Sequence, residues 1–249
     1  MNRQILKCLT VVAIAVAATL TSCQKDDNDN VKVKLLETLT GPYGAFDKFE
    51  YDSQNRLSKY TRYNSGGELL ETRALTYSGN DLVKTEFNSA QLHEYTKSGN
   101  KITAILSSDV TQTWDLNNDG QLIKYVGEIV GNSQVINYLY QNGNIVKYTY
   151  VYTYAEGGTH EVILDEYKYD DIKSPMYNCT TPQWYLIYSF MDISTANNVT
   201  EEKWSVNSDI GVQTNRYEYE YDSDGYPTKR TITHSNGSKE VTEYAYKEL

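Results

Sequence analysis

Residues 140–154 read Tyr-Gln-Asn-Gly-Asn-Ile-Val-Lys-Tyr-Thr-Tyr-Val-Tyr-Thr-Tyr, and this stretch decides the fold class. Its Asn142-Gly143 pair supplies the positive φ angles that a tight β-hairpin turn requires. Beyond the turn the chain alternates with a period of two, which places four tyrosines on one face: Tyr148, Tyr150, Tyr152 and Tyr154. Lysine, threonine and valine take the other face. An alternation this rich in Tyr, Thr and Val predicts β-strand and not helix.

The same unit recurs along the chain: an aromatic residue, a turn of Asp, Asn, Ser and Gly, an apolar residue, then a lysine. Five of the apolar residues lie 25, 20, 20 and 23 positions apart: Leu57, Leu82, Ile102, Leu122 and Ile145. Two strands of about eight residues with their turns consume roughly that length. The sequence therefore predicts an all-β fold, with one domain over residues 31–249. In it an antiparallel meander of hairpins forms a strongly curved sheet or a soluble barrel.

The repeat lapses between about residues 170 and 202, where Pro175, Pro182 and Asn197-Asn198 interrupt the strand pattern. This segment is expected to be an insertion that crosses one end of the sheet. Residues 183–191 are apolar enough for a short helix or a capping segment. Binding residues concentrate in loops on a rigid sheet, so three aromatic side chains here are the first candidates for ligand contact: Trp184, Tyr185 and Tyr188.

The N-terminus resembles a bacterial lipoprotein signal. Arg3 and Lys7 precede an apolar run from Cys8 to Leu20, which is too short for a membrane-spanning helix, and the segment ends in Leu20-Thr21-Ser22-Cys23. The resemblance implies that residues 1–22 are removed and that Cys23 carries the acyl chains. Residues 23–30 then form an acidic, disordered tether. Its Lys-Asp-Asp order resembles the signal that exports Bacteroidota lipoproteins to the outer face of the outer membrane, although any solvated linker can be rich in Asp and Asn.

The net charge limits the classes of partner that the protein can bind, and the cysteine content limits the role of Cys179. Loss of Arg3 and Lys7 with the signal leaves 21 basic against 33 acidic residues, a formal charge of −12. A nucleic-acid partner is excluded by this balance because it requires a basic stripe, and anionic lipid is disfavoured for the same reason. Once Cys8 is removed and Cys23 is lipidated, Cys179 is alone; it is read as a small buried hydrophobe before a catalytic thiol.

Few residues follow a metal or catalytic pattern. Asp115, Asn117 and Asp119, with Gly120, match the first half of a calcium loop, but position twelve is Val126 in place of glutamate. Turn chemistry explains the same residues, so this is a weak Ca²⁺ candidate. The turn at Asp222 and Asp224 is read in the same way. No zinc spacing, phosphate loop or nucleophile elbow is present in the sequence, and no cofactor is expected.

The Tyr-Asp turn units at 51–59 and 221–229 resemble the YD repeats of RHS-type proteins. The chain is similar, more closely, to a family of Bacteroidota lipoproteins of unknown function with a porin-like fold. That likeness rests on the Cys23 motif, the acidic tether, the hairpins, the 170–175 segment and the Asn197-Asn198 break. The resemblance implies a curved antiparallel sheet or barrel and no activity. The chain differs from RHS-type proteins in that it lacks the many dozens of repeats and the toxin module of a full RHS shell.

A porin-like fold does not by itself predict a pore. A membrane barrel presents an apolar residue outward at every second position, whereas Glu218 and Glu220 oppose a tyrosine face here. The sequence therefore favours a surface lipoprotein that binds a glycan or a protein partner without enzymatic activity. The alternative is a structural envelope scaffold with no small-molecule ligand, and the third hypothesis is a glycan-active enzyme.

Overall fold

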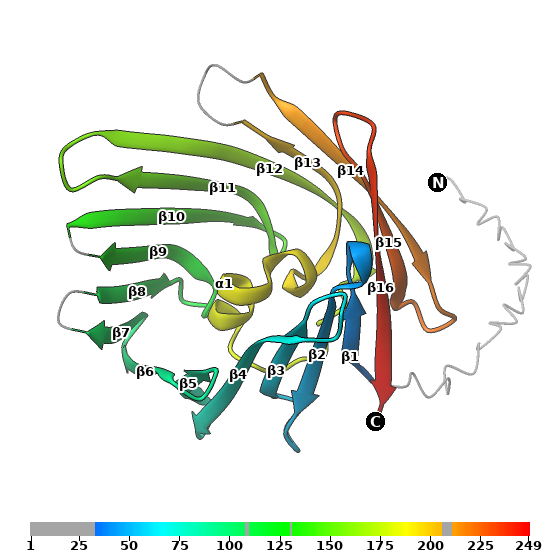
Figure 1. Ribbon diagram of the computed structural model, residues 1–249, viewed down its shortest axis with the longest axis horizontal. Coiled ribbons are helices and arrows are strands. Elements are labelled where there is room, and N and C mark those ends of the chain that lie inside the picture. The colour runs from blue at the N-terminus through cyan, green and yellow to red at the C-terminus, as the bar shows by residue number, and fades with distance from the viewer. Residues whose placement is uncertain (1–32, 108–109, 130, 206–210) are drawn as a thin grey trace, which may run out of the picture. The chain divides into compact units, whose positions relative to one another are not determined.

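The computed structural model describes residues 33–107, 110–129, 131–205 and 211–249, which form a closed antiparallel β-barrel (Figure 1). The predicted all-β meander is confirmed, and of the two predicted forms the barrel is the one adopted. Residues 1–22, Cys23 and the tether 23–30 lie outside the described residues. In the described part, no helix is long and apolar enough to cross a membrane.

Sixteen strands of the described chain follow one another around the wall, and β1 pairs with β16 to close it. The strands are β1 (Lys34–Thr40), β2 (Phe46–Tyr51), β3 (Leu57–Tyr63), β4 (Leu69–Ser78), β5 (Asp81–Phe87), β6 (Gln91–Ser98), β7 (Lys101–Ser107), β8 (Val110–Leu116), β9 (Leu122–Ile129), β10 (Asn132–Gln141), β11 (Asn144–Thr153), β12 (Thr159–Lys173), β13 (Asn197–Trp204), β14 (Gln213–Tyr221), β15 (Pro227–Thr233) and β16 (Lys239–Glu248). A short 3₁₀ turn, η1 (Pro42–Gly44), follows β1, and helix α1 (Gln183–Ser194) lies between β12 and β13.

The turns of the repeat units all lie at one end of the barrel, which we call the repeat-turn end. Each of these turns follows an even-numbered strand, and in an antiparallel meander all even-numbered strands end on the same side. Two of these turns are built alike: Asp52 Oδ1 accepts the backbone N–H groups of Gln54 and Arg56 at 2.9 and 3.0 Å. Asp222 does the same two and four residues on. β1 also begins at this end. The other end, with the loop at residues 41–45, is called the opposite end.

The alternation of the strands fills the lumen with apolar and aromatic side chains. The five apolar residues of the repeat units are each at most 4% exposed: Leu57, Leu82, Ile102, Leu122 and Ile145. Tyr148 and the stacked Tyr138, with ring centroids 6.1 Å apart, pack with this core, while Tyr154 at the opposite end is exposed. Tyr138 and Tyr148 therefore belong to the core, and the core does not extend to Tyr154.

The outer wall carries charged side chains. Cross-strand ion pairs join Lys229 to Glu220 at 2.7 Å and Lys168 to Glu201 at 2.8 Å. Lys101 lies 3.6 Å from Asp115 on the next strand. A membrane-spanning barrel presents an apolar band on this face. Charged pairs at these strand positions instead fit a wall that faces water.

Helix α1 lies inside the barrel (yellow in Figure 1). Four consecutive side chains, Trp184 to Ile187, are each at most 4% exposed, so the helix is covered on every side over this turn. A helix that is apolar all round is one that is buried. The helical geometry breaks at Phe190, where φ is −145° and ψ is 40°, and the last turn runs to Ser194. The predicted short helix is confirmed.

Candidate binding site in the barrel lumen

The segment 174–196, which we call the plug, enters the barrel from the repeat-turn end and returns to it. Thr180 donates its backbone N–H to the Asn55 carbonyl at 3.0 Å, and the Leu57 N–H donates to Thr181 Oγ1 at 2.7 Å. Asn178 Nδ2 donates to the Lys34 carbonyl at 2.9 Å. These contacts tie the plug to β1 and to the β2–β3 hairpin, which are far from it in sequence. The plug therefore closes this end of the barrel.

The base of the plug is fixed by Asp170, on β12. Its carboxylate accepts the backbone N–H of Asn198 at 3.0 Å and the Tyr221 hydroxyl at 2.5 Å. Asn198, 2% exposed, also donates Nδ2 to the Lys173 carbonyl at 3.1 Å. The Asn197-Asn198 break seen in the sequence thus holds the two stems of the insertion together.

Asp170→Ala is expected to lower the free energy of unfolding by about 2–3 kcal/mol, since it leaves the N–H group of the buried Asn198 and the partly buried Tyr221 hydroxyl without their charged acceptor. Urea unfolding followed by tryptophan fluorescence measures the change. The neighbouring Asp171 is exposed, so Asp171→Ala serves as the control and should change the stability by less than about 0.5 kcal/mol. Equal effects of the two substitutions would contradict the assigned role.

A second fastening lies where β1 begins. Lys34 Nζ contacts Asp222 Oδ2 at 2.8 Å and Asp224 Oδ2 at 2.5 Å, and its side chain is only 10% exposed. The acid-rich turn that resembles half a calcium loop therefore holds an internal ammonium group. Burial by itself would raise the pKa of Asp222, but hydrogen bonds from Lys34 and from backbone N–H groups of its own turn outweigh burial and lower the pKa.

This lowered pKa sets a pH dependence. The folded protein binds a proton at Asp222 less readily than the unfolded chain does, so the ion pair contributes its stability above about pH 4 and loses it as the pH falls through the lower, folded pKa. Asp222→Asn keeps the turn but removes the charge. It is expected to cost about 1–2 kcal/mol at pH 7 and to flatten the acid side of the stability profile. Urea titrations between pH 2 and 7 measure this, and an unchanged acid slope would argue against the assignment.

The three aromatic candidates of the insertion belong to the plug. Trp184 lies with its ring centroid 5.2 Å from those of Trp114 and Tyr95, and Tyr188 lies 4.9 Å from Tyr125. Tyr185 is 1% exposed. The insertion enters the lumen and does not lie over the rim, so Tyr185 and Tyr188 pack against the barrel interior.

Trp184 also lines a cavity of about 520 Å³ at the repeat-turn end, which we call the Trp184 cavity. Asp119 is on its wall. Ligand contact by Trp184 is thus compatible with the structure and stays a prediction.

The residues of the weak calcium candidate do other work. Asp115 faces Lys101 on the outer wall, and Asn117 Oδ1 accepts the N–H groups of Asp119 and Gln121 at 3.0 and 2.9 Å to close the turn. Over the described ranges, no cluster of three His, Cys, Asp or Glu side chains could hold a metal ion.

Cys179 lies within the plug and packs against the core. Burial raises the pKa of its thiol, against hydrogen bonds from Thr181 that lower it. A raised pKa disfavours the thiolate at neutral pH, which fits a packing role.

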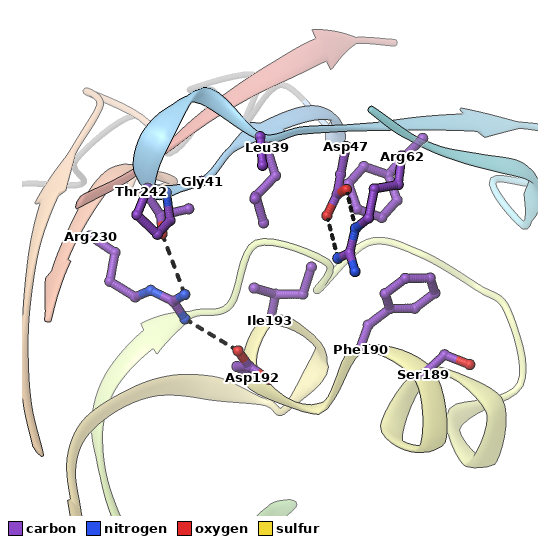
Figure 2. A pocket seen from close by; sticks show the side chains of 13 residues that line it. Leu39, Gly41, Asp47, Arg62, Ser189, Phe190, Asp192, Ile193, Arg230 and Thr242 are labelled. Carbon is purple, nitrogen blue, oxygen red and sulfur yellow. Dashed lines mark hydrogen bonds and ion pairs between the residues drawn. The ribbon is translucent and has the colours of Figure 1, made fainter. Parts of the chain in front are cut away.

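A second cavity, of about 390 Å³, lies at the opposite end between the last turn of α1 and strands β1, β2, β3, β15 and β16 (Figure 2). We call it the Arg230 cavity. Its apolar lining includes Leu39, Phe190 and Ile193. Two pairs of opposite charge face each other across this lining, Asp47 with Arg62 and Asp192 with Arg230.

The two ion pairs differ in their contact distances and in the number of hydrogen bonds that the arginine makes. Arg62 is held in two hydrogen bonds by the Asp47 carboxylate, at 2.8 and 3.0 Å. Arg230 meets Asp192 only at 3.8 Å and donates a long, 3.5 Å contact to Thr242 Oγ1. Its side chain is 8% exposed, and in the described chain its Nε has no partner. The Arg230 guanidinium is therefore buried, charged and incompletely paired.

These charged cavity residues were not predicted from the sequence. A signal was present, because Arg230 takes the same side of β15 as Ile232 while Lys229 and Thr231 take the outer side. A charge with inward parity on a strand marks a group that must find a buried partner.

Comparison with known proteins agrees with the fold. No protein-family model matches the chain, and a search of curated proteins finds no match either. Among solved structures, a porin-like protein from Bacteroides uniformis is similar over 87% of this chain and 98% of its own, with a TM-score of 0.55 and 16% identity. A porin-like protein from Bacteroides vulgatus aligns with 86% of this chain and 100% of its own, at a TM-score of 0.42 and 13% identity. The first supports the fold; the second, below 0.5, carries no further weight. Membership in a lipoprotein family and kinship with YD repeats stay predictions.

Proposed function

We propose that this chain is a non-enzymatic binding protein of the bacterial cell envelope, held in the outer membrane by lipid on Cys23 and facing outside the cell, and that it binds a glycan in the Arg230 cavity. The observation that carries the proposal is the cavity itself. Its volume of about 390 Å³ lies within the usual range for small-molecule sites, and it joins an apolar lining to a few polar groups.

The envelope part of the proposal rests on the Leu20-Thr21-Ser22-Cys23 motif and on the charged outer wall. In this proposal the lipid on Cys23 attaches the protein to the membrane. The charged pairs on the outer wall disfavour insertion of the strands themselves into the bilayer. The likeness to a porin-like protein of Bacteroides supports the same location. The plug supports a binding role over a conducting role, because α1 fills the lumen that a pore would keep open.

A structural scaffold is the second candidate. Buried tyrosines and charged pairs on the outer wall fit such a scaffold, and the described barrel has both. A protein partner bound on an exposed aromatic face is less well supported, since Tyr138, Tyr148 and the other tyrosines of the core cluster are turned inward. The two hypotheses therefore differ in one testable respect: a binding protein takes up a ligand in the Arg230 cavity, and a scaffold does not.

The test uses the mature chain from residue 23 with Cys23→Ser, screened on a glycan array and then by calorimetry. Ser189 is one of the residues that line the Arg230 cavity, and Ser189→Trp places a large ring at its wall. Ile105, on β7, is 68% exposed, and Ile105→Trp places the same ring outside as a control. We expect saturable binding that Ser189→Trp removes and Ile105→Trp keeps. Binding unaffected by Ser189→Trp would refute the site, and no binding on the array would favour the scaffold.

A further inference from the structure

We infer that the Arg230 cavity recognises a carboxylate, and that its ligand is an acidic sugar of the hexuronate class. This rests on the proposed function, whose glycan it specifies. Arg230 is a buried cation that its own protein does not fully pair.

The first step is the hydrogen-bond balance of the guanidinium. Arginine has five N–H donors, and charge-assisted bonds to carboxylates are about 2.7–2.9 Å long. Arg230 has contacts of 3.8 Å to Asp192 and 3.5 Å to Thr242 and lies over the Tyr217 ring at 5.8 Å from its centroid, but its Nε has no hydrogen-bond partner within the described residues. A desolvated charge left in this state is costly, and an anion that enters the cavity relieves the cost.

The second step is the comparison with Arg62 in the same cavity. Its two bonds to Asp47 show the arrangement that a satisfied guanidinium adopts here. Arg230 lacks the equivalent carboxylate, because Asp192 is 70% exposed and lies after the helical break at Phe190. In Figure 2 the contacts of Arg230 to Asp192 and Thr242 diverge from the guanidinium. A ligand carboxylate can take the place that Asp192 fills only loosely.

The third step is the charge of the ligand. Asp47 and Asp192 both line the cavity, so a divalent anion such as sulfate or phosphate meets two negative groups beside one available cation. A single carboxylate on a neutral body meets less repulsion. Leu39, Phe190 and Ile193 offer that body an apolar surface, which suits the apolar face of a sugar ring.

The test is calorimetry on the mature chain with Cys23→Ser, using three probes: the methyl glycoside of galacturonate, which carries a single carboxylate, its methyl ester and inorganic sulfate. The ester keeps the size of the acid and removes its charge. We expect the acid to bind about 10- to 100-fold more tightly than the ester, the range of one charge-assisted pair. Sulfate should not displace it at equal concentration. Equal binding of acid and ester, or displacement by sulfate, would overturn the inference.

Two variants locate the contact. Arg230→Gln should weaken binding of the acid by about tenfold or more, whereas Arg216→Gln, a charge loss at a 74%-exposed site, should not change it. Asp192→Asn removes the competing carboxylate at an exposed position and should tighten binding severalfold. Asp192→Asn therefore tests the carboxylate site even where Arg230→Gln does not fold. Unchanged affinity of the acid for Asp192→Asn would refute the site. A neutral glycan that binds and is lost in Ser189→Trp would uphold the proposed function and refute only the carboxylate.

Discussion

Trp114→Ala is expected to lower the free energy of unfolding by about 3–5 kcal/mol, which is the usual cost of removing a large aromatic side chain from a packed core. Trp114 is fully buried at the point where strands and plug meet. Its ring centroid lies within 5.6 Å of four other aromatic rings: Tyr95, Tyr125, Trp184 and Tyr188. The plug and the wall both lose contacts, so the cavity that remains cannot close without movement of α1.

Urea unfolding monitored by far-UV circular dichroism measures this loss, because the signal comes from the strands and not from the deleted indole. Ile105→Ala removes a large side chain from the outer wall, where it is 68% exposed, and is expected to change stability by about 0.5 kcal/mol or less. A loss below about 1 kcal/mol in Trp114→Ala, against the usual cost of such a deletion, would mean that plug and wall do not pack as described.

Replacement of the plug is expected to abolish cooperative folding. The backbone N–H of Ser174 donates to the Ala196 carbonyl at 3.4 Å, so the ends of the plug touch and a short Gly-Ser linker can replace residues 175–195. The replacement removes the buried side chains from Trp184 to Ile187. Each costs about 2–5 kcal/mol when truncated in a core, and a domain of ordinary stability has only about 5–15 kcal/mol in total.

Differential scanning calorimetry and binding of a hydrophobic dye test this result. We expect no sharp transition and strong dye binding, because the inward faces of the strands lose their cover. Replacement of the exposed turn 235–238 by the same linker is the control and should leave a cooperative transition. A barrel that still unfolds cooperatively without its plug would show that the wall is self-sufficient, and that the plug is a removable occupant of the lumen.

The local structure could be predicted from the sequence because it is set by local rules. Asn142-Gly143 and the Asp52 turn fix hairpins through backbone conformation and side-chain hydrogen bonds, and the period-two pattern then assigns Leu57 and Ile145 to the inside. Closure could not be predicted in this way. It depends on the pairing of β1 with β16, from opposite ends of the described chain, and on the register of every strand between them.

The role of the insertion was only partly predictable. Its helix was expected, and Trp184, Tyr185 and Tyr188 were interpreted as candidates for ligand contact because loops on sheets usually carry binding residues. Their burial could not be predicted from the segment alone, because it depends on the lumen of a closed barrel, which is a space that needs filling. Arg230 was not predicted because its loose partner, Asp192, comes from the helix, and because Leu39 of the same cavity comes from a strand that is distant in sequence.

The most direct test of the central claim, a water-facing barrel held to the membrane by lipid alone, is fractionation of two forms of the chain expressed in a Bacteroidota host. One form is the full chain; in the other, residues 1–23 are replaced by a signal peptide that is cleaved without lipidation. We predict that the full chain sediments with the outer membrane and that the second form stays in the supernatant after ultracentrifugation. Sedimentation of the second form with the outer membrane, and its release by detergent alone, would contradict the account.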